Sequence, residues 1–352
     1  MIARTRTIGL ASALAVLATV VVIGALVWLR PDLLPAALRA PRPLVPLRLA
    51  DTAFEGSAPI YVAIEQGYFR DEGLDVSMTQ TQAGWQNLKL LFEGQADLAM
   101  VADLPIAYTL VDRHKYTNAD YAPFVILANT LFNYGLSEAL GMRDRGVLAP
   151  KDLEGRTVAV HRGTTTDFFF DVFAKTHGLD ESRIKVIDLP TRKHLAALES
   201  GEVDAAFSFR GDTLEQKRVL GARAQSLRTP ISYSTAWLVV ALKAYSKEHP
   251  DELAAFLRAL RRAIDHMGTD PAAALQATVK HSGYPPEVVK ELLADYQFAL
   301  SLSESLFSVL ADEMQWVNGT LNKPAAGKSN LLDIVDTEPL RRAYPDAIKL
   351  IR

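Results

Sequence analysis

Leu88–Met100 reads LKLLFEGQADLAM, and Leu195–Phe207 reads LAALESGEVDAAF. Aligned without gaps, the two segments share Leu, Leu, Gly, Asp and Ala at five positions. In each, an apolar helical face ends at a glycine suited to the C′ position of a helix, and an aspartate then begins an apolar strand. The repetition predicts that the chain builds the same helix-to-strand unit twice, once in each of two α/β lobes.

The pattern around the first segment predicts alternating strands and helices. Strand patterns at 47–54, 74–81 and 97–101 are each followed by a helical pattern, and 124–130 is a further apolar strand. The order βαβαβα is typical of a doubly wound sheet with parallel strands.

The same alternation restarts around the second segment. Strand patterns at 155–163, 184–190 and 203–209 are each followed by a helix, and an apolar strand at 232–242 leads into a helical tail. We therefore expect a two-lobed α/β fold in which each lobe is a doubly wound, mainly parallel sheet and a hinge joins the two. Residues 48–128 with 238–352 form lobe I, and residues 130–232 form lobe II.

The first residues form a separate segment. Residues 8–29 carry no charge and follow Arg4 and Arg6, and their number is close to the roughly 20 residues that span a bilayer. A secretory signal has a shorter apolar region, and the nearest cleavage point, after Ala40, is followed by a proline. We expect residues 1–30 to be a transmembrane anchor, with a cleaved signal segment as the alternative, and residues 31–47 to be a proline-rich linker.

Composition narrows the function classes. The chain has 352 residues, a net charge of −3 and no cysteine, which excludes disulfides, thiolate metal sites and cysteine nucleophiles and argues against nucleic-acid binding. The seven histidines show no H-x-x-x-H pair, and the G-x-S-x-G, Walker A and G-x-G-x-x-G motifs are absent. We expect no metal, no cofactor and no enzymatic activity, so the sequence favours binding over catalysis.

Ligands of open parallel sheets bind beyond the carboxyl ends of the strands, where helices begin and backbone N–H groups are free. The predicted contacts are the residues at those ends: Phe54, Glu55, Gly56, Ser57, Gly84, Trp85, Asp103, Thr164, Thr165, Thr166, Asp167 and Arg210.

Several of these residues also have a purely structural interpretation. Asp103, Asp167 and the threonines suit helix N-caps. Trp85 suits either ligand stacking or the core, and Arg210 either an anion contact or the surface. Glu55 has no evident structural role.

Several longer segments resemble a known family. APIYVAIEQGYFRDEGLDVSM (58–78), GRTVAVHRGTTTDFFF (155–170) and GYPPEVVKELLADYQF (283–298) are similar to the extracytoplasmic substrate-binding proteins of ABC importers, in the branch for nitrate, sulfonates, taurine and thiamine pyrimidine precursors. The resemblance implies a type II periplasmic-binding-protein fold whose lobes close over a small solute. It also implies delivery to a membrane permease with its ATPase, a place in the periplasm or at the cell exterior, and a monomer.

The resemblance leaves the ligand open. Helix N-termini favour an oxyanion such as a sulfonate, whereas Trp85 with two of the carboxylates Glu55, Asp103 and Asp167 suits an aminopyrimidine-like group. In both cases we expect a small organic solute. The alternatives are an enzyme on the same fold, of the menaquinone-pathway or pyrimidine-precursor type, and a ligand-sensing receptor without transport. The segment FSFRGD (207–212) lacks the Trp-Glu-Pro type sequence of the family, which leaves contacts there open.

Overall fold

The computed structural model describes residues 43–116, 123–230, 234–321 and 330–350. The predicted anchor of residues 1–30 and most of the predicted linker lie outside these ranges. Strand β1, Val45–Thr52, begins inside the predicted linker, so the folded part starts earlier than predicted. Across the ranges listed above, no helix combines the length and apolarity needed to cross a bilayer.

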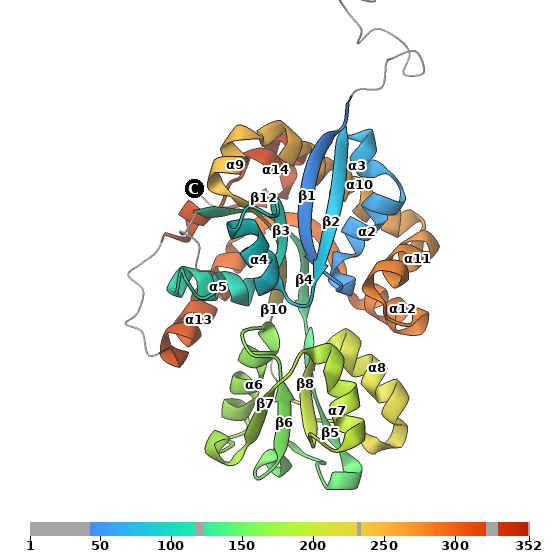
Figure 1. The fold of residues 1–352 in the computed structure, drawn as a ribbon, viewed down its shortest axis with the longest axis vertical. Coiled ribbons are helices and arrows are strands. Elements are labelled where there is room, and N and C mark those ends of the chain that lie inside the picture. The colour runs from blue at the N-terminus through green and yellow to red at the C-terminus, as the bar shows by residue number, and fades with distance from the viewer. Residues whose placement is uncertain (1–42, 117–122, 231–233, 322–329, 351–352) are drawn as a thin grey trace, which may run out of the picture. The chain divides into compact units, whose positions relative to one another are not determined.

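The strands of the described ranges form two sheets (Figure 1). The larger has the order β12-β11-β4-β10-β3-β1-β2, and the smaller β7-β6-β8-β5-β9. The strands after β1 are β2 (Leu74–Thr81), β3 (Leu98–Ala102), β4 (Phe124–Tyr134), β5 (Ser137–Met142), β6 (Thr157–Val160), β7 (Lys185–Asp188), β8 (Ala205–Phe209), β9 (Ala224–Ser226), β10 (Ser234–Leu242), β11 (Gln297–Ser303) and β12 (Ile348–Lys349).

Helices connect the strands and cover the sheets. The α-helices that accompany the larger sheet are α2 (Ala58–Glu65), α3 (Tyr68–Asp71), α4 (Gly84–Phe92), α5 (Asp103–Val111), α9 (Lys243–Glu248), α10 (Pro250–Thr269), α11 (Pro271–Ser282), α12 (Pro286–Asp295), α13 (Glu304–Thr320) and α14 (Glu338–Ala343). Those of the smaller sheet are α6 (Thr165–Thr176), α7 (His194–Ser200) and α8 (Arg210–Leu220). Short 3₁₀ turns include η3 (Glu55–Ser57) and η7 (Thr191–Lys193).

The chain crosses between the sheets twice, from β4 to β5 and from β9 to β10. Because the crossing strands enter antiparallel to their neighbours, β10 pairs antiparallel with β3 and β4, and β5 pairs antiparallel with β8 and β9. The prediction of a mainly parallel sheet in each lobe is therefore wrong, and both sheets are mixed. The crossings also place β4 and β10 entirely in the larger sheet, whereas the predicted lobe boundaries fall inside these two strands.

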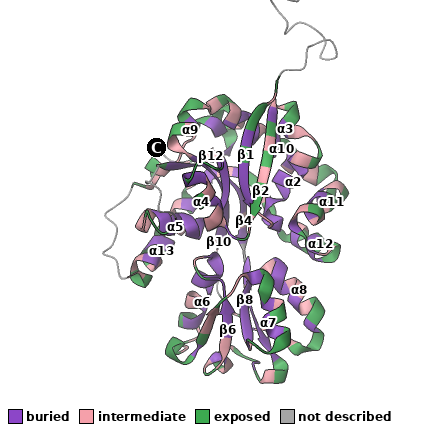
Figure 2. Cartoon of the chain, in the orientation of Figure 1, coloured by how far each residue is buried: buried purple, intermediate pink, exposed green. Residues whose placement is uncertain are grey.

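The parallel strands form the buried centres of the sheets. Every residue of β3 is buried, as are the first four of β8, and Figure 2 shows these central strands in purple between more exposed helices. Strands covered on both faces read as continuous apolar runs. The carboxyl ends of these strands are thus held in fixed positions.

The repeated segments have the same role in both sheets. Gly94 and Gly201 adopt left-handed conformations, with φ of 67° and 86°, and each ends its helix. Asp97 Oδ2 then accepts the backbone N–H of Arg48 at 2.7 Å, and Asp204 Oδ2 accepts that of Thr157 at 3.0 Å. In each lobe an aspartate just before the central strand accepts a backbone N–H of the parallel neighbour and so ties the two strands together.

A buried polar chain fixes the turn that follows β1. Asp51 is fully buried, and Ser57 donates to its Oδ1 at 2.8 Å. The indole N–H of Trp237 donates in turn to Ser57 Oγ at 2.8 Å. Burial raises the pKa of Asp51 to about 7, against the opposing effect of the Ser57 hydrogen bond. These hydrogen bonds join β1, η3 and β10.

We expect Asp204→Ala to lower the free energy of unfolding by about 1–3 kcal/mol, because the Thr157 N–H then lacks its partner in a partly buried site. Asp97→Ala should have a similar effect in the other lobe. Urea unfolding checks both, with Asp75→Ala as control, since the Asp75 ion pair is exposed and 3.6 Å long. Equal stability of all three variants would contradict the proposed tie.

We expect Asp51→Asn to gain stability relative to the wild type as pH rises. The folded-state pKa of Asp51 lies above its unfolded value of about 3.9, so the native state binds more protons and stability falls as pH rises from about 4 to about 7. The side chain of Asn does not titrate, so the Asp51→Asn variant lacks this pH-dependent loss of stability. Denaturant unfolding at several pH values between 4 and 8 measures the difference, and a constant gap between the two proteins would refute the assignment.

Candidate functional site

A cavity of about 180 Å³ lies between the two sheets, at the carboxyl ends of β1, β2 and β3 from one lobe and of β6, β7 and β8 from the other. Its lining residues are Thr52, Ala53, Phe54, Thr81, Gln82, Ala83, Gly84, Ala102, Pro105, Leu136, Thr164, Thr165, Pro190, Thr191, Arg192, Lys193, Phe209, Asp212, Trp237 and Tyr284. This is where ligands of α/β sheets bind.

One part of the cavity wall is aromatic. The rings of Phe54 and Trp237 lie 4.9 Å apart with an edge-to-face tilt, and Phe54 lies 6.2 Å from Phe209 of the other lobe. Gly56 holds Phe54 there, because a Cβ at Gly56 would lie 2.1 Å from the ring. The aromatic group can bury the apolar part of a solute.

Another part of the wall is polar and faces the first turn of α6. Thr164 is the N-cap residue by backbone conformation, and its hydroxyl donates to the His161 carbonyl at 2.7 Å. Thr165 is almost fully buried, and its Oγ1 has no hydrogen-bond partner. The first N–H groups of a helix lack intrahelical partners and attract negative charge. The beginning of α6 can therefore hold an anionic group.

Three charged residues of the described part of the chain line the cavity. Arg192 Nε lies 3.5 Å from Asp212 Oδ1, and burial raises the pKa of Asp212 despite this guanidinium. Within the described ranges, the ammonium of Lys193 has no carboxylate within ion-pair distance. Arg192 and Asp212 compensate each other, so Lys193 supplies an excess positive charge.

The sequence analysis missed this charged group. Residues 190–193 follow β7, and the rule of strand ends that indicated the other contacts also applies to this strand. Tyr284, by contrast, comes from the loop between α11 and α12 in the C-terminal tail, and no strand-end pattern points to it.

Of the predicted contacts, Phe54, Gly84, Thr164 and Thr165 line the cavity. Gly84 begins α4, and a Cβ there would lie 3.4 Å from the Ala102 backbone nitrogen, an ordinary van der Waals distance. The other predicted residues lie in its surroundings and contact protein groups.

Glu55 and Asp103 are both fully buried outside the cavity lining. Tyr296 donates its hydroxyl to Glu55 Oε1 at 2.8 Å, and the backbone N–H of Ala236 donates to Asp103 Oδ2 at 2.7 Å. Burial raises the pKa of each carboxyl to about 7. Both groups are thus held by the protein itself and favour their neutral forms near the site.

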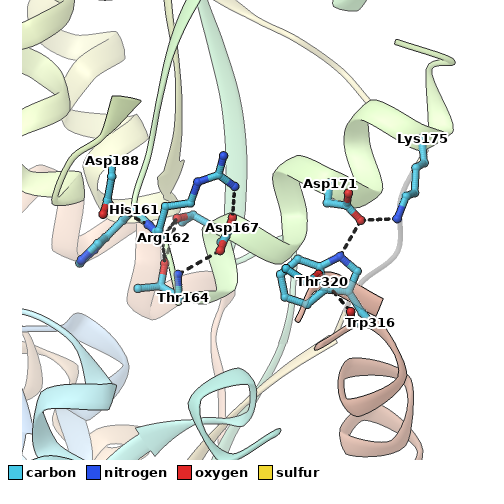
Figure 3. Close-up of polar contacts among 11 residues, drawn as sticks. His161, Arg162, Thr164, Asp167, Asp171, Lys175, Asp188, Trp316 and Thr320 are labelled. Carbon is cyan, nitrogen blue, oxygen red and sulfur yellow. Dashed lines mark hydrogen bonds and ion pairs between the residues drawn. The ribbon is translucent and has the colours of Figure 1, made fainter. Parts of the chain in front are cut away.

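Asp167 lies beside the cavity and binds two groups of its own lobe, as Figure 3 shows. It accepts from the Arg162 guanidinium at 2.6 Å and from the Gly163 N–H at 3.0 Å. Thr166 contacts the Thr164 hydroxyl at 2.9 Å. Side-chain hydrogen bonds thus tie the loop before α6 to the first turn of the helix.

Ser57 is engaged with Asp51 and Trp237, as described above. Trp85 stacks on Tyr116, with ring centroids 5.7 Å apart. Arg210 forms an ion pair with Asp295 on α12 and lies outside the cavity lining. No group of three or more His, Asp and Glu residues in the described ranges is placed to hold a metal ion.

The family and structure comparisons agree with this geometry. The family model described as NMT1/THI5 like matches residues 55–274. The chain is 24% identical over 311 residues to a protein of Bacillus subtilis (strain 168) named for binding aliphatic sulfonates, covering 82% of this chain and 86% of that protein. It is 23% identical over 277 residues to the formylaminopyrimidine-binding protein of Halalkalibacterium halodurans, covering 74% of each.

Solved structures share the fold. The alkanesulfonate-binding protein from Xanthomonas axonopodis pv. citri bound to MOPS superposes with a TM-score of 0.68 at 17% identity, over 84% of this chain and 99% of that one. A desulfurization enzyme superposes with a TM-score of 0.65 at 13% identity, over 86% and 99%. The two-lobed α/β periplasmic-binding-protein fold expected from the sequence is confirmed, and with the family model covering more than half of its length, this chain belongs to the NMT1/THI5-like family.

Proposed function

We propose that this protein is the solute-binding component of an ABC importer, which captures a small organic anion between its lobes and delivers it to a membrane permease. The observation that carries the proposal is the cavity itself. Six strand ends from both sheets converge on it, so a solute held there contacts both lobes. Two relatives of this chain are named as binding proteins.

The lining supports binding over catalysis. Among the residues that the structure describes, the lining contains no histidine or glutamate, and its one aspartate, Asp212, is engaged by Arg192 and Tyr284. General acid–base or nucleophilic catalysis needs a free base beside a reactive group. A desulfurization enzyme shares the fold, but the chemistry of this lining supports a non-catalytic role.

The charges support an anionic solute. Three carboxylates at strand ends would repel an anion if they faced it. Glu55 and Asp103 are fully buried outside the lining and have raised pKa values, and Asp167 is paired with Arg162 outside the lining. Lys193, the unpartnered Thr165 hydroxyl and the first turn of α6 remain on the polar wall. These groups suit a sulfonate or another oxyanion.

The size and the aromatic wall support an organic solute. A water molecule occupies about 10–15 Å³ of cavity volume, so a cavity of 180 Å³ has room for about a dozen water molecules. This volume is larger than a nitrate ion requires. Phe54, Phe209 and Trp237 supply an apolar wall for a hydrocarbon group. An aminopyrimidine is the second candidate, because the same rings offer stacking surfaces.

Location and partners follow from this function. Capture for import takes place outside the cytoplasm, which agrees with an N-terminal anchor or signal in residues 1–30 and with a monomer that docks on its permease. A sensing receptor would bind the same solute, and reconstitution with the permease distinguishes it from a transporter. Contacts from Trp85, Asp167 and Arg210 remain predictions.

We expect Thr165→Val and Lys193→Gln each to weaken pentanesulfonate binding about tenfold, or ~1.4 kcal/mol, because each removes one donor to the anion. Isothermal titration of the full chain measures this. Lys185→Gln is the matched control, since Lys185 is an exposed cation of β7 outside the cavity. Wild-type affinity in both cavity variants would exclude an anion at the beginning of α6.

We expect affinity for linear alkanesulfonates to rise about fourfold per methylene until the aromatic wall is covered, since each buried CH₂ contributes about 0.8 kcal/mol. Titrations with taurine, nitrate and methane- to hexanesulfonate test this series. A preference for nitrate, or for an aminopyrimidine over every sulfonate, would overturn the assigned ligand class.

A further inference from the structure

Arg192 reaches from one lobe to the other. It lies in η7, after β7 of the smaller sheet. Its Nη2 donates to the Ala53 carbonyl at 3.0 Å and to the Ser282 carbonyl at 2.8 Å, both in the lobe of the larger sheet. Its guanidinium carbon lies 3.5 Å from the ring centroid of Tyr284, which belongs to that same lobe.

Tyr284, from the lobe of the larger sheet, contacts α8 of the smaller sheet's lobe. Its hydroxyl donates to Asp212 Oδ1 at 2.8 Å, and this carboxylate on α8 also faces Arg192 Nε at 3.5 Å. A Cβ at Gly211 would lie 2.7 Å from Tyr284 Cζ, so the tyrosine reaches α8 only because residue 211 is a glycine. The three side chains form a continuous set of contacts across the two lobes.

We propose that Arg192, Tyr284 and Asp212 form a clasp that holds the lobes closed, with Arg192 as its positioning residue, and that the clasp must separate each time solute enters or leaves. The proposal rests on the proposed function. All three residues line the cavity. The part of the cavity wall that they form is therefore complete only while the clasp is formed. Separation of the lobes breaks the contacts of Tyr284 with Arg192 and Asp212 and both hydrogen bonds of Arg192 Nη2, because these join groups of opposite lobes. The Arg192–Asp212 contact lies within the lobe of the smaller sheet.

The chemistry requires a guanidinium. Its planar group stacks on an aromatic ring while its N–H groups donate in the plane, and the compact ammonium of lysine cannot do both. Tyr284 and Asp212 are buried, which strengthens the interaction with Arg192. Another ion pair between the lobes, Arg218 with Glu287, has both side chains about half exposed and a 3.5 Å separation, and such pairs contribute little.

The test uses the absence of cysteine. Ser77→Cys on β2 and Glu199→Cys on α7 place spin labels at exposed positions, one on each lobe, with no background thiol in the full chain. Pulsed dipolar spectroscopy then gives the distance distribution between the lobes, with and without pentanesulfonate. Arg192→Gln, Arg192→Lys and Tyr284→Phe are compared with the wild type, and Arg218→Gln is the control.

We expect the wild type without added solute to show a short-distance population that falls several-fold in Arg192→Gln and is not restored in Arg192→Lys. Tyr284→Phe should give an intermediate loss and Arg218→Gln none. Thermal unfolding confirms that each variant is folded. Unchanged distributions in Arg192→Gln, or full restoration by lysine, would overturn the clasp. Because the labels report closure without added ligand, a wrong ligand class would leave this result intact.

Discussion

Two neighbouring crossings of the chain set the geometry on which the site depends. β4 and β10 are adjacent strands of the larger sheet, and β5 and β9 are adjacent strands of the smaller sheet. The first crossing turns at Gly135, whose φ of 84° favours a residue without a Cβ. Because the chain passes from one sheet to the other at these crossings, strand ends of both sheets lie around the same cavity.

The cores explain how much of the fold the sequence predicted. Strands buried on both faces, such as β3 and β8, have continuous apolar patterns, and the helices beside them end at glycines with positive φ. Those local signals fixed the alternating elements. The short strands β9 and β12 and the half-exposed β11 carry no such pattern. They depend on partners far away in sequence, as does the antiparallel entry of β10, so local periodicity could not predict the mixed sheets.

The site was predictable in position and less so in its residues. The rule of strand ends located Phe54, Gly84, Thr164 and Thr165, because backbone topology alone decides which ends converge. It could not tell whether a carboxylate at such an end faces the cavity or the protein. Glu55 points to Tyr296, whose position 241 residues later in the chain no local pattern reveals. Tyr284 likewise enters the site from the C-terminal tail.

This sorting of charges determines what the cavity can hold. A carboxylate removed from water favours its neutral form unless a cation compensates it. Glu55 and Asp103 are removed from water and have pKa values of about 7. Asp212 faces Arg192, which also donates to two carbonyls of the opposite lobe. These carboxyls are neutralised inside the protein or paired with groups of the protein, and Asp167 at the first turn of α6 is paired with Arg162. Among the described residues, Lys193 lines the cavity without a carboxylate partner. In the proposed function, an anion supplies the charge that balances Lys193, so its binding and the closure of the lobes around it favour each other.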